Sequence, residues 1–309
     1  MNACIHRHIA RFVLITLVLS CLIGQAQAAV TDWVGNAHAA ARLITAVEAT
    51  GSAKRIDAGL QIRLAPGWHA YWRNPGDAGV PPSIDWSRSE NLANADIAWP
   101  APKRFSVQEL ETQGYEDGVV LPISVALAHP GAPLTLHAEV DYAACAEVCV
   151  PYHAGFSLVL PAGLALPGPE APLIATARAK VPVDPDRAGL RLVAADVTET
   201  KGEAILSVRL ASTAIPLIAP DLFIEGLTNG SPGRPVVDLA DGGRTATLAV
   251  PVRGADATAV IGRPLRLTAV DGSRAAEFGA TPVAGALPPL TGARIPAASW
   301  GSLYSAAWC

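Results

Sequence analysis

Residues 134–160 read LTLHAEVDYAACAEVCVPYHAGFSLVL. The apolar and alternating character at the two ends of this stretch, over residues 134–140 and 156–160, predicts two β-strands. Cys145 and Cys149 lie between them. In a straight strand, residues at this spacing are about 13 Å apart, whereas a disulfide requires Cα atoms within about 7 Å. A bond between the two cysteines therefore requires the chain to turn back, which predicts a disulfide at the tip of a hairpin, near the surface. Pro151 is expected to limit strand pairing just beyond Cys149.

The N-terminal residues predict export. Arg7 and Arg11 supply positive charge, residues 12–24 are almost entirely apolar, and Ala26-Gln27-Ala28 follows. A charged start, a short apolar run and small residues at the cleavage positions are typical of a secretory signal peptide. The apolar run is shorter than the roughly 20 residues that a membrane-spanning helix needs. We therefore expect a signal peptide over residues 1–28, cleaved near Ala28, and a periplasmic product.

Charge and cysteine content narrow the function classes. The net charge is −4 and the chain has no basic stripe, which argues against a nucleic-acid partner. Of the five cysteines, Cys4 and Cys21 fall within the predicted leader, where Cys21 also weakly resembles a lipoprotein cleavage site. An exported protein meets an oxidising compartment. The closely spaced Cys145 and Cys149 are therefore expected to form a disulfide, and Cys309 is left without a partner.

The rest of the chain consists of short apolar runs separated by proline and glycine. Runs of this length between turn residues are typical of sandwich-type sheets, so we expect an all-β protein. The clearest predicted strands lie at residues 60–64, 119–127, 134–140, 156–160, 204–210, 245–252 and 265–270. Residues 39–49 fit a helix or a strand, and residues 171–180 predict one short helix.

Length and proline content predict two domains. Removal of residues 1–28 leaves about 280 residues, enough for two domains that each bury a core. Residues 161–185 are proline-rich and contain the expected boundary. We place a first domain at residues 29–168, a linker at 169–185, a second β-sandwich domain at 186–284 and a tail at 285–309.

The spacing of the cysteines leaves three roles open for the pair. A structural disulfide is one, although a ring of about five residues gains only about 2 kcal/mol from loop closure, and this bridge would hold only its own turn. A redox-active disulfide is the second, because exposed disulfides are the labile ones. The third is a copper or zinc site with His153 as an additional ligand, for which no fourth ligand is evident.

Four sequence elements, in a fixed order along the chain, favour the redox role. Residues 67–82 read GWHAYWRNPGDAGVPP, residues 99–102 read WPAP, residues 114–122 read GYEDGVVLP, and residues 142–151 read YAACAEVCVP. Together they resemble the signature of the N-terminal periplasmic region of the DsbD/ScsB family of thiol:disulfide interchange proteins. The resemblance covers the first domain well, whereas the second domain matches only in position and β-like character.

The resemblance implies a fold and a mechanism. Domains of this family are immunoglobulin-like and carry one redox-active cysteine pair, here Cys145 and Cys149. The reduced pair passes electrons to periplasmic thioredoxin-like oxidoreductases or isomerases, and a membrane electron donor re-reduces it; no cofactor is implied. The expected activity is an electron relay of the protein-disulfide reductase type, with a role in cytochrome c or disulfide maturation, or in copper tolerance as in the ScsB branch. The rival interpretation is a non-catalytic binding or chaperone-like β-sandwich with a structural disulfide.

Several neighbours of the pair are supporting candidates. Tyr142 is expected either to pack over the pair or to lie in the core, and Glu147 either to accept a proton or to be a solvated turn residue. Tyr115 and Asp117 complete the candidates, with Asp117 in a cap over the cysteines. The aromatic residues Trp68, Tyr71 and Trp72 are expected to pack in the core or under loops, and residues 74–77 are expected to form a turn.

The sequence also departs from the family pattern. Full-length members continue into several membrane helices and a C-terminal domain with a C-x-x-C pair, and neither is found in this sequence. The chain is therefore expected to be either the periplasmic fragment of a larger reductase or a shorter, freely diffusing redox protein. In both cases it has no electron source of its own.

Overall fold

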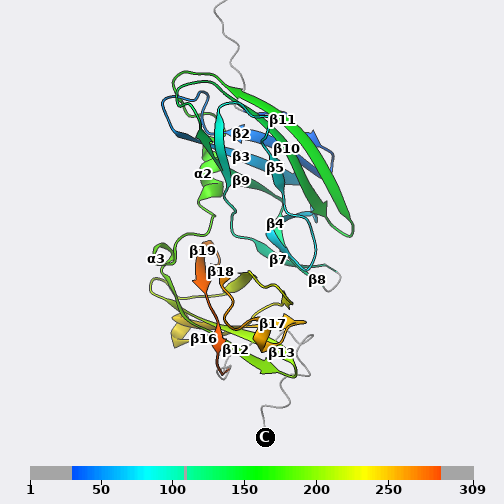
Figure 1. Ribbon diagram of the computed structural model, residues 1–309, viewed down its shortest axis with the longest axis vertical. Coiled ribbons are helices and arrows are strands. Elements are labelled where there is room, and N and C mark those ends of the chain that lie inside the picture. The colour runs from blue at the N-terminus through cyan, green and yellow to red at the C-terminus, as the bar shows by residue number, and fades with distance from the viewer. Residues whose placement is uncertain (1–29, 108–109, 287–309) are drawn as a thin grey trace, which may run out of the picture.

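The computed structural model describes residues 30–107 and 110–286. These residues form mostly antiparallel β-sheets in two bodies, which we call the N-terminal domain (strands β1 to β11) and the C-terminal domain (strands β12 to β20) (Figure 1). The mostly β-structure confirms the predicted class. The predicted signal peptide, Cys309 and most of the predicted tail lie outside the described residues.

Two sheets build the N-terminal domain. The first has the order β1 (Val34–Gly35), β2 (Ala39–Thr45), β3 (Arg55–Leu64), β9 (Gly118–Leu127) and β6 (Leu92–Ile97). The second has the order β11 (Cys149–Leu160), β10 (Leu134–Cys145), β4 (His69–Gly76), β8 (Leu110–Glu116) and β7 (Lys103–Val107), with β5 (Ser83–Asp85) paired to β10. Both sheets contribute to one core.

Two further sheets build the C-terminal domain. The larger has the order β15 (Ser231–Pro232), β17 (Thr245–Arg253), β13 (Glu203–Ser212), β12 (Leu190–Thr200) and β20 (Val283–Ala284), with β16 (Val236–Ala240) paired to β17. The smaller has the order β14 (Asp221–Glu225), β18 (Leu265–Asp271) and β19 (Arg274–Ala280). Two short 3₁₀ turns, Asp241–Gly243 and Ala257–Ala259, connect strands of this domain.

Among the described residues, two α-helices lie between the strands of the two domains in the chain. Helix α2 (Ala171–Arg178) occupies the predicted helical segment and packs Ile174 and Ala177 against the N-terminal domain. Helix α3 (Pro185–Ala188) is a single turn. Residues 39–49, which fitted either a helix or a strand, contain strand β2, whose backbone is paired on both sides by β1 and β3. None of the helices among the described residues is long and apolar enough to cross a membrane.

The hairpin of β10 and β11 carries the cysteines at its tip. Its ladder is unbroken from Leu134 paired with Leu160 to Cys145 paired with Cys149. The prediction that Pro151 limits pairing is therefore wrong, since Pro151 pairs with Ala143. Strand β11 lies at the edge of its sheet, where a proline is tolerated because its missing N–H need not face a partner strand.

The alternation of buried and partly exposed residues along β10 shows why its first part was readable from sequence. Alternate residues from Leu134 to Tyr142 are buried, as expected for a strand with one face toward the core. From Ala143 to Cys145 every residue is buried, because Tyr71 of the neighbouring strand β4 packs on Ala143 and Cys145 on the face away from the main core. The burial of Ala143 and Cys145 thus depends on a tertiary contact and not on the residue pattern of β10 itself.

Candidate functional site

The disulfide joins Cys145 at the end of β10 to Cys149 at the start of β11, with Cα atoms 4.1 Å apart. This confirms the disulfide and the hairpin predicted from the spacing. The two sulfurs are not equivalent. Cys145 is 1 % exposed, whereas Cys149 and the preceding turn residues Glu147 and Val148 are exposed. The Cys149 side of the disulfide is therefore the side that faces solvent.

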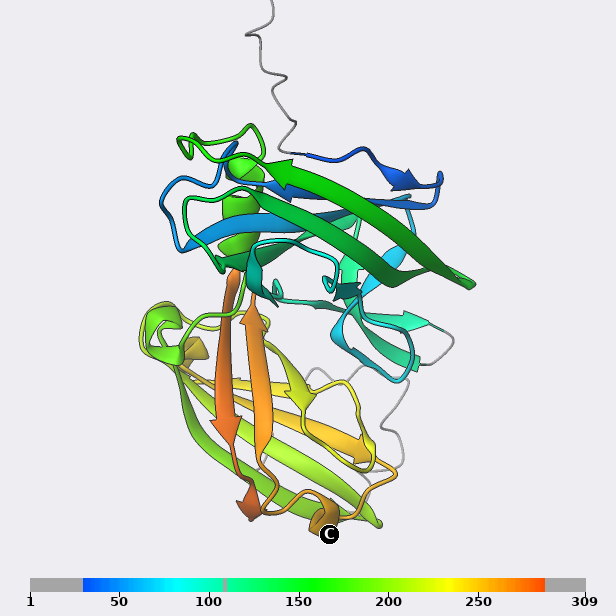
Figure 2. The same ribbon diagram turned by 45° about the horizontal axis from the view of Figure 1, so that its top comes forward.

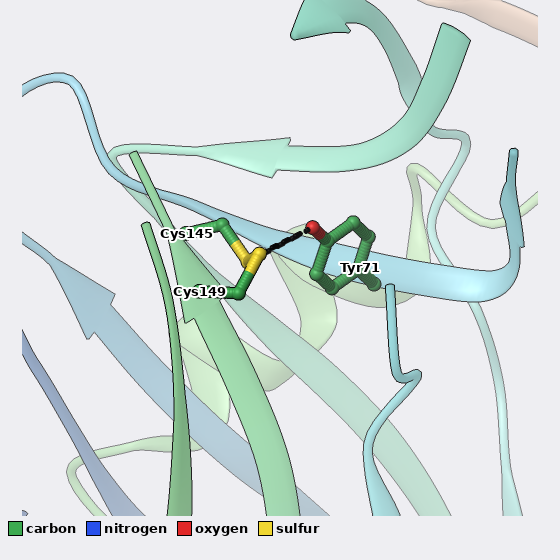
Figure 3. Close-up of a disulfide and its surroundings, with 3 residues drawn as sticks. All are labelled: Tyr71, Cys145 and Cys149. Carbon is green, nitrogen blue, oxygen red and sulfur yellow. Dashed lines mark hydrogen bonds between the residues drawn. A yellow bond between two sulfur atoms is a disulfide. The ribbon is translucent and has the colours of Figure 1, made fainter. Parts of the chain in front are cut away.

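Tyr71 is the side chain that contacts the disulfide (Figure 3). Its hydroxyl lies 2.9 Å from the sulfur of Cys145, to which it donates a hydrogen bond, and 3.3 Å from that of Cys149. Tyr71 is buried, and burial raises the pKa of its hydroxyl, so it stays a donor at neutral pH. The prediction for Tyr71 was incomplete, because this buried aromatic residue is also a polar partner of both sulfurs.

Strand order brings Tyr71 to the cysteines. Strand β4 lies between β10 and β8, and its residues His69 and Ala70 pair with Cys145 and Ala144. Side chains two residues apart on a strand share a face. His69, Tyr71 and Cys145 therefore lie on one face, and the small cluster of Tyr71, Ala143 and Cys145 is separate from the main core.

Glycine at position 79 makes room for the tyrosine. Gly79 has φ +119°, and a Cβ atom built there would lie 2.2 Å from Cε1 of the Tyr71 ring. No side chain fits in that space. The loop that contains Gly79 can therefore approach the Tyr71 ring this closely only because position 79 is a glycine.

We expect Gly79→Ala to destabilise the fold by about 1–3 kcal/mol, the usual cost of overpacking, and to move Tyr71 away from the sulfurs. Urea unfolding measures the first effect, and the rate of disulfide reduction by dithiothreitol reports the second. Gly67→Ala is the matched control, because Gly67 also has a positive φ but a Cβ there would meet no atom within 4 Å. Equal losses in the two variants would contradict the crowding argument.

His69 is a buried titratable group beside the disulfide. Its ring stacks on Phe105 of β7 at 5.0 Å and meets Tyr71 edge-on at 5.4 Å. Its Nε2 atom has no hydrogen-bond partner among the described residues. Burial lowers the pKa of His69 from the usual 6.5, and the negative charge of Glu116 offsets this only in part.

We therefore expect the protein to lose stability as the pH falls below about 6.5. The unfolded chain takes up a proton there that buried His69 resists, so the unfolded state is favoured by at most about 1.4 kcal/mol per pH unit. His69→Gln removes this component, and urea unfolding between pH 7 and pH 5 measures it. His129→Gln, at an exposed position, is the control. An unchanged pH dependence in His69→Gln would refute the assignment.

Tyr142, one of the supporting candidates, does not lie at the disulfide. Tyr142 is buried in the main core, where its ring stacks on Tyr152 at 5.0 Å, and burial raises its pKa. Tyr142 and Cys145 are three residues apart on β10 and so face opposite sides of the sheet. Tyr142 is thus a core residue, and packing over the pair, which was the other option for it, does not occur.

Glu147 is exposed in the turn between the cysteines, and the structure shows no contact of Tyr115 or Asp117 with the sulfurs. Tyr115 is buried on the core side, donates a hydrogen bond to the Pro100 carbonyl, and has a pKa raised by burial. Asp117 is exposed at the turn from β8 to β9, with φ 61°. Residues 74–77, expected as a turn, instead finish strand β4 and begin the turn after it.

His153 does not join the cysteines. Its two ring nitrogens lie 2.9 Å from a carboxylate oxygen of Asp141 and 3.3 Å from one of Glu139. Both carboxylates belong to β10, which pairs with β11. Within residues 30–107 and 110–286, no group of three or more metal-ligating side chains comes together. The copper or zinc site with His153 therefore has no support in the geometry.

Comparison with known proteins bears on both domains. Residues 40–161 match the family model of the N-terminal domain of the thiol:disulfide interchange protein DsbD, and residues 180–285 match a domain family of unknown function, DUF8393. The crystal structure of the N-terminal periplasmic domain of ScsB from Proteus mirabilis matches with a TM-score of 0.65 at 26% sequence identity. The match covers 84% of this chain and 100% of that chain. Curated protein sequences include no significant match.

Proposed function

Residues 40–161 form a DsbD N-terminal domain, and on that premise we propose that the protein exchanges disulfides with periplasmic thioredoxin-like proteins through Cys145 and Cys149. The observation that carries the proposal is the asymmetry of the disulfide, which joins one buried and one exposed cysteine at a hairpin tip. A bridge of this kind contributes little to holding the sheets together, since it joins neighbouring residues of one ladder. It is open to attack at Cys149.

The proposed reaction starts from the reduced pair. The Cys149 thiolate attacks a partner disulfide, forms a mixed disulfide and releases one partner thiolate. The Cys145 thiolate then attacks the sulfur of Cys149, which closes the Cys145–Cys149 bond and releases the second partner thiolate. The partner gains two electrons, the cysteine pair loses two, and the two partner thiolates take up protons from solvent or from the thiols.

The Tyr71 hydroxyl is placed to stabilise the reduced form of the cysteine pair. Hydrogen bonds to charged acceptors are roughly twice as strong as those to neutral ones, so its hydroxyl supports a thiolate on Cys145 more than the disulfide. Exposed Val148, at 65 %, offers an apolar contact to a partner beside Cys149. Reduction of the pair in turn requires an external donor, which we propose to be a membrane-linked thiol:disulfide reductase.

Three finer features belong to the same proposal. The family resemblance implies an immunoglobulin-like fold for the first domain, and we extend it to the second because its strands also form packed sheets. Export into the periplasm is supported by the signal-peptide pattern of residues 1–28 and by the likeness to a periplasmic ScsB domain. A role in copper tolerance or in cytochrome c and disulfide maturation is proposed from the family resemblance alone.

A redox titration tests the function. The protein is equilibrated anaerobically with glutathione or dithiothreitol buffers, and the fraction of free thiol is measured by alkylation. An exchanging pair should have a potential above about −300 mV, whereas structural disulfides are typically more reducing. A potential well below that value, combined with loss of stability on reduction, would favour the rival interpretation of a structural disulfide.

A further inference from the structure

Side chains of strand β4 contact both the disulfide and the C-terminal domain. Tyr71 reaches the sulfurs within the N-terminal domain, and Arg73, two residues later, reaches Glu225 and Glu277 of the C-terminal domain. Residues two apart on a strand are separated by about 7 Å of backbone. The contacts of Tyr71 and of Arg73 are therefore made by neighbouring residues on the same face of one strand.

The sheet itself does not hold this part of β4. Pairing of β4 with β8 is regular from His69 to Tyr71 and shifts register before Gly76. In the irregular stretch, the Asn74 side-chain amide donates to the Ile224 carbonyl at 2.9 Å, and the Trp72 ring meets Phe223 at 5.9 Å. Both partners belong to β14, so the C-terminal domain supplies contacts where the β8 ladder is interrupted.

Arg73 adds ion pairs to these contacts. Its guanidinium binds Glu225 through two nitrogens, at 3.0 Å from Nε and 2.7 Å from Nη2, and binds Glu277 at 2.5 Å. The group also lies 4.4 Å above the Trp72 ring. The Arg73 side chain is 18 % exposed. A forked arginine–carboxylate contact with little solvent fixes direction as well as distance.

Strand β14 is suited to this role because it is an edge strand, with β18 as its ladder partner. Besides Asn74 and Arg73, it is contacted by Arg104, which binds the Asp221 carboxylate and the Leu222 carbonyl. Two backbone carbonyls of β14, those of Leu222 and Ile224, thus accept hydrogen bonds from side chains of the N-terminal domain. Figure 2 shows the two domains meeting at this junction.

We propose that the C-terminal domain, which has no assigned function, holds strand β4 in the position that keeps the Tyr71 hydroxyl on the two sulfurs. In this proposal, Arg73 and Asn74 are positioning residues that act through Tyr71. The proposal rests on the proposed exchange function, because it assigns the C-terminal domain the task of setting the redox equilibrium of the Cys145–Cys149 pair.

The proposal predicts the direction in which the redox equilibrium of the cysteine pair should shift. Tyr71 stabilises the thiolate of the reduced pair more than the disulfide, so loss of its hydroxyl should shift the equilibrium with glutathione toward the disulfide. We expect about a tenfold shift for Tyr71→Phe, which corresponds to about 30 mV for a two-electron couple. Arg73→Met and Asn74→Ala should shift the equilibrium in the same direction by about threefold.

The test is a double-mutant cycle on the equilibrium constant with glutathione in the full chain. Arg73→Met and Asn74→Ala are each measured alone and together with Tyr71→Phe. If they act through Tyr71, their threefold shifts should disappear in the Tyr71→Phe background. Arg73→Lys keeps the charge without the fork and should fall between the native protein and Arg73→Met. Asn74→Ala leaves no buried charge unpaired, so it keeps the test available if Arg73→Met does not fold.

Arg55→Met is the matched control, because it removes an exposed ion pair with Asp96 on the other sheet and should leave the equilibrium unchanged. Equal shifts in the presence and absence of the Tyr71 hydroxyl, or no shift in folded Asn74→Ala, would overturn the proposal. Failure of the exchange function is a separate outcome, since a native disulfide that does not equilibrate with glutathione ends the experiment before any variant is compared.

Discussion

Cys145→Ala should trap a stable mixed disulfide with a thioredoxin-like protein, whereas Cys149→Ala should form it at least about 100-fold more slowly, because buried cysteines are nearly inert. Cys149 is exposed at the start of β11, and Cys145 is 1 % exposed beneath Tyr71. In Cys145→Ala, the accessible thiol remains and the resolving thiol is gone, so the mixed disulfide persists. In Cys149→Ala, the remaining thiol faces the interior.

The measurement uses a thioredoxin-like protein activated as a mixed disulfide with an aromatic thiol, whose release is followed by absorbance. Wild-type protein should release the aromatic thiol without accumulating the complex, because Cys145 resolves it. Denatured Cys149→Ala is the control for intrinsic reactivity, since unfolding exposes Cys145 and should restore the rate. Equal rates for the two folded variants would show that burial does not set the order of attack.

Phe223→Ala should lower the free energy of unfolding by about 3–5 kcal/mol, the usual range for a buried phenylalanine. Phe223 belongs to β14 of the C-terminal domain, yet its side chain is 1 % exposed within the core of the N-terminal domain. There it packs against Trp72, and Arg104 lies over its ring at 5.0 Å. Truncation thus leaves a cavity at the junction of the two domains.

Urea unfolding measures the loss of free energy. Hydrogen exchange of the β10 amides measures whether that loss reaches the N-terminal domain. Protection of β10, which is in the other domain, should fall in Phe223→Ala. Phe278→Ala is the matched control, because Phe278 is buried within the C-terminal core and should lower protection mainly in its own domain. A loss under about 1 kcal/mol, or protection of β10 that is unaffected, would show that Phe223 does not couple the domains.

The sequence by itself determined the local features. Alternation over residues 134–140, the short apolar runs elsewhere and the proline and glycine between them predicted the strands, because a side-chain period of two is a property of the strand alone. The cysteine spacing predicted the hairpin tip, since the reach of a disulfide limits how the intervening residues can run. The order of four elements over residues 67–151 indicated the DsbD N-terminal type.

The tertiary structure alone decided which side chains meet. Tyr71 and Cys149 are 78 residues apart, and Arg73 and Glu225 are 152 apart. The pattern of a strand states which residues share a face but not which strand lies beside it. For this reason Tyr142, close to the cysteines in sequence, lies in the core, while Tyr71 contacts the sulfurs. The packing of Phe223 from β14 in the core of the N-terminal domain also depends on how the sheets of the two domains pack, which the alternation within each strand does not encode.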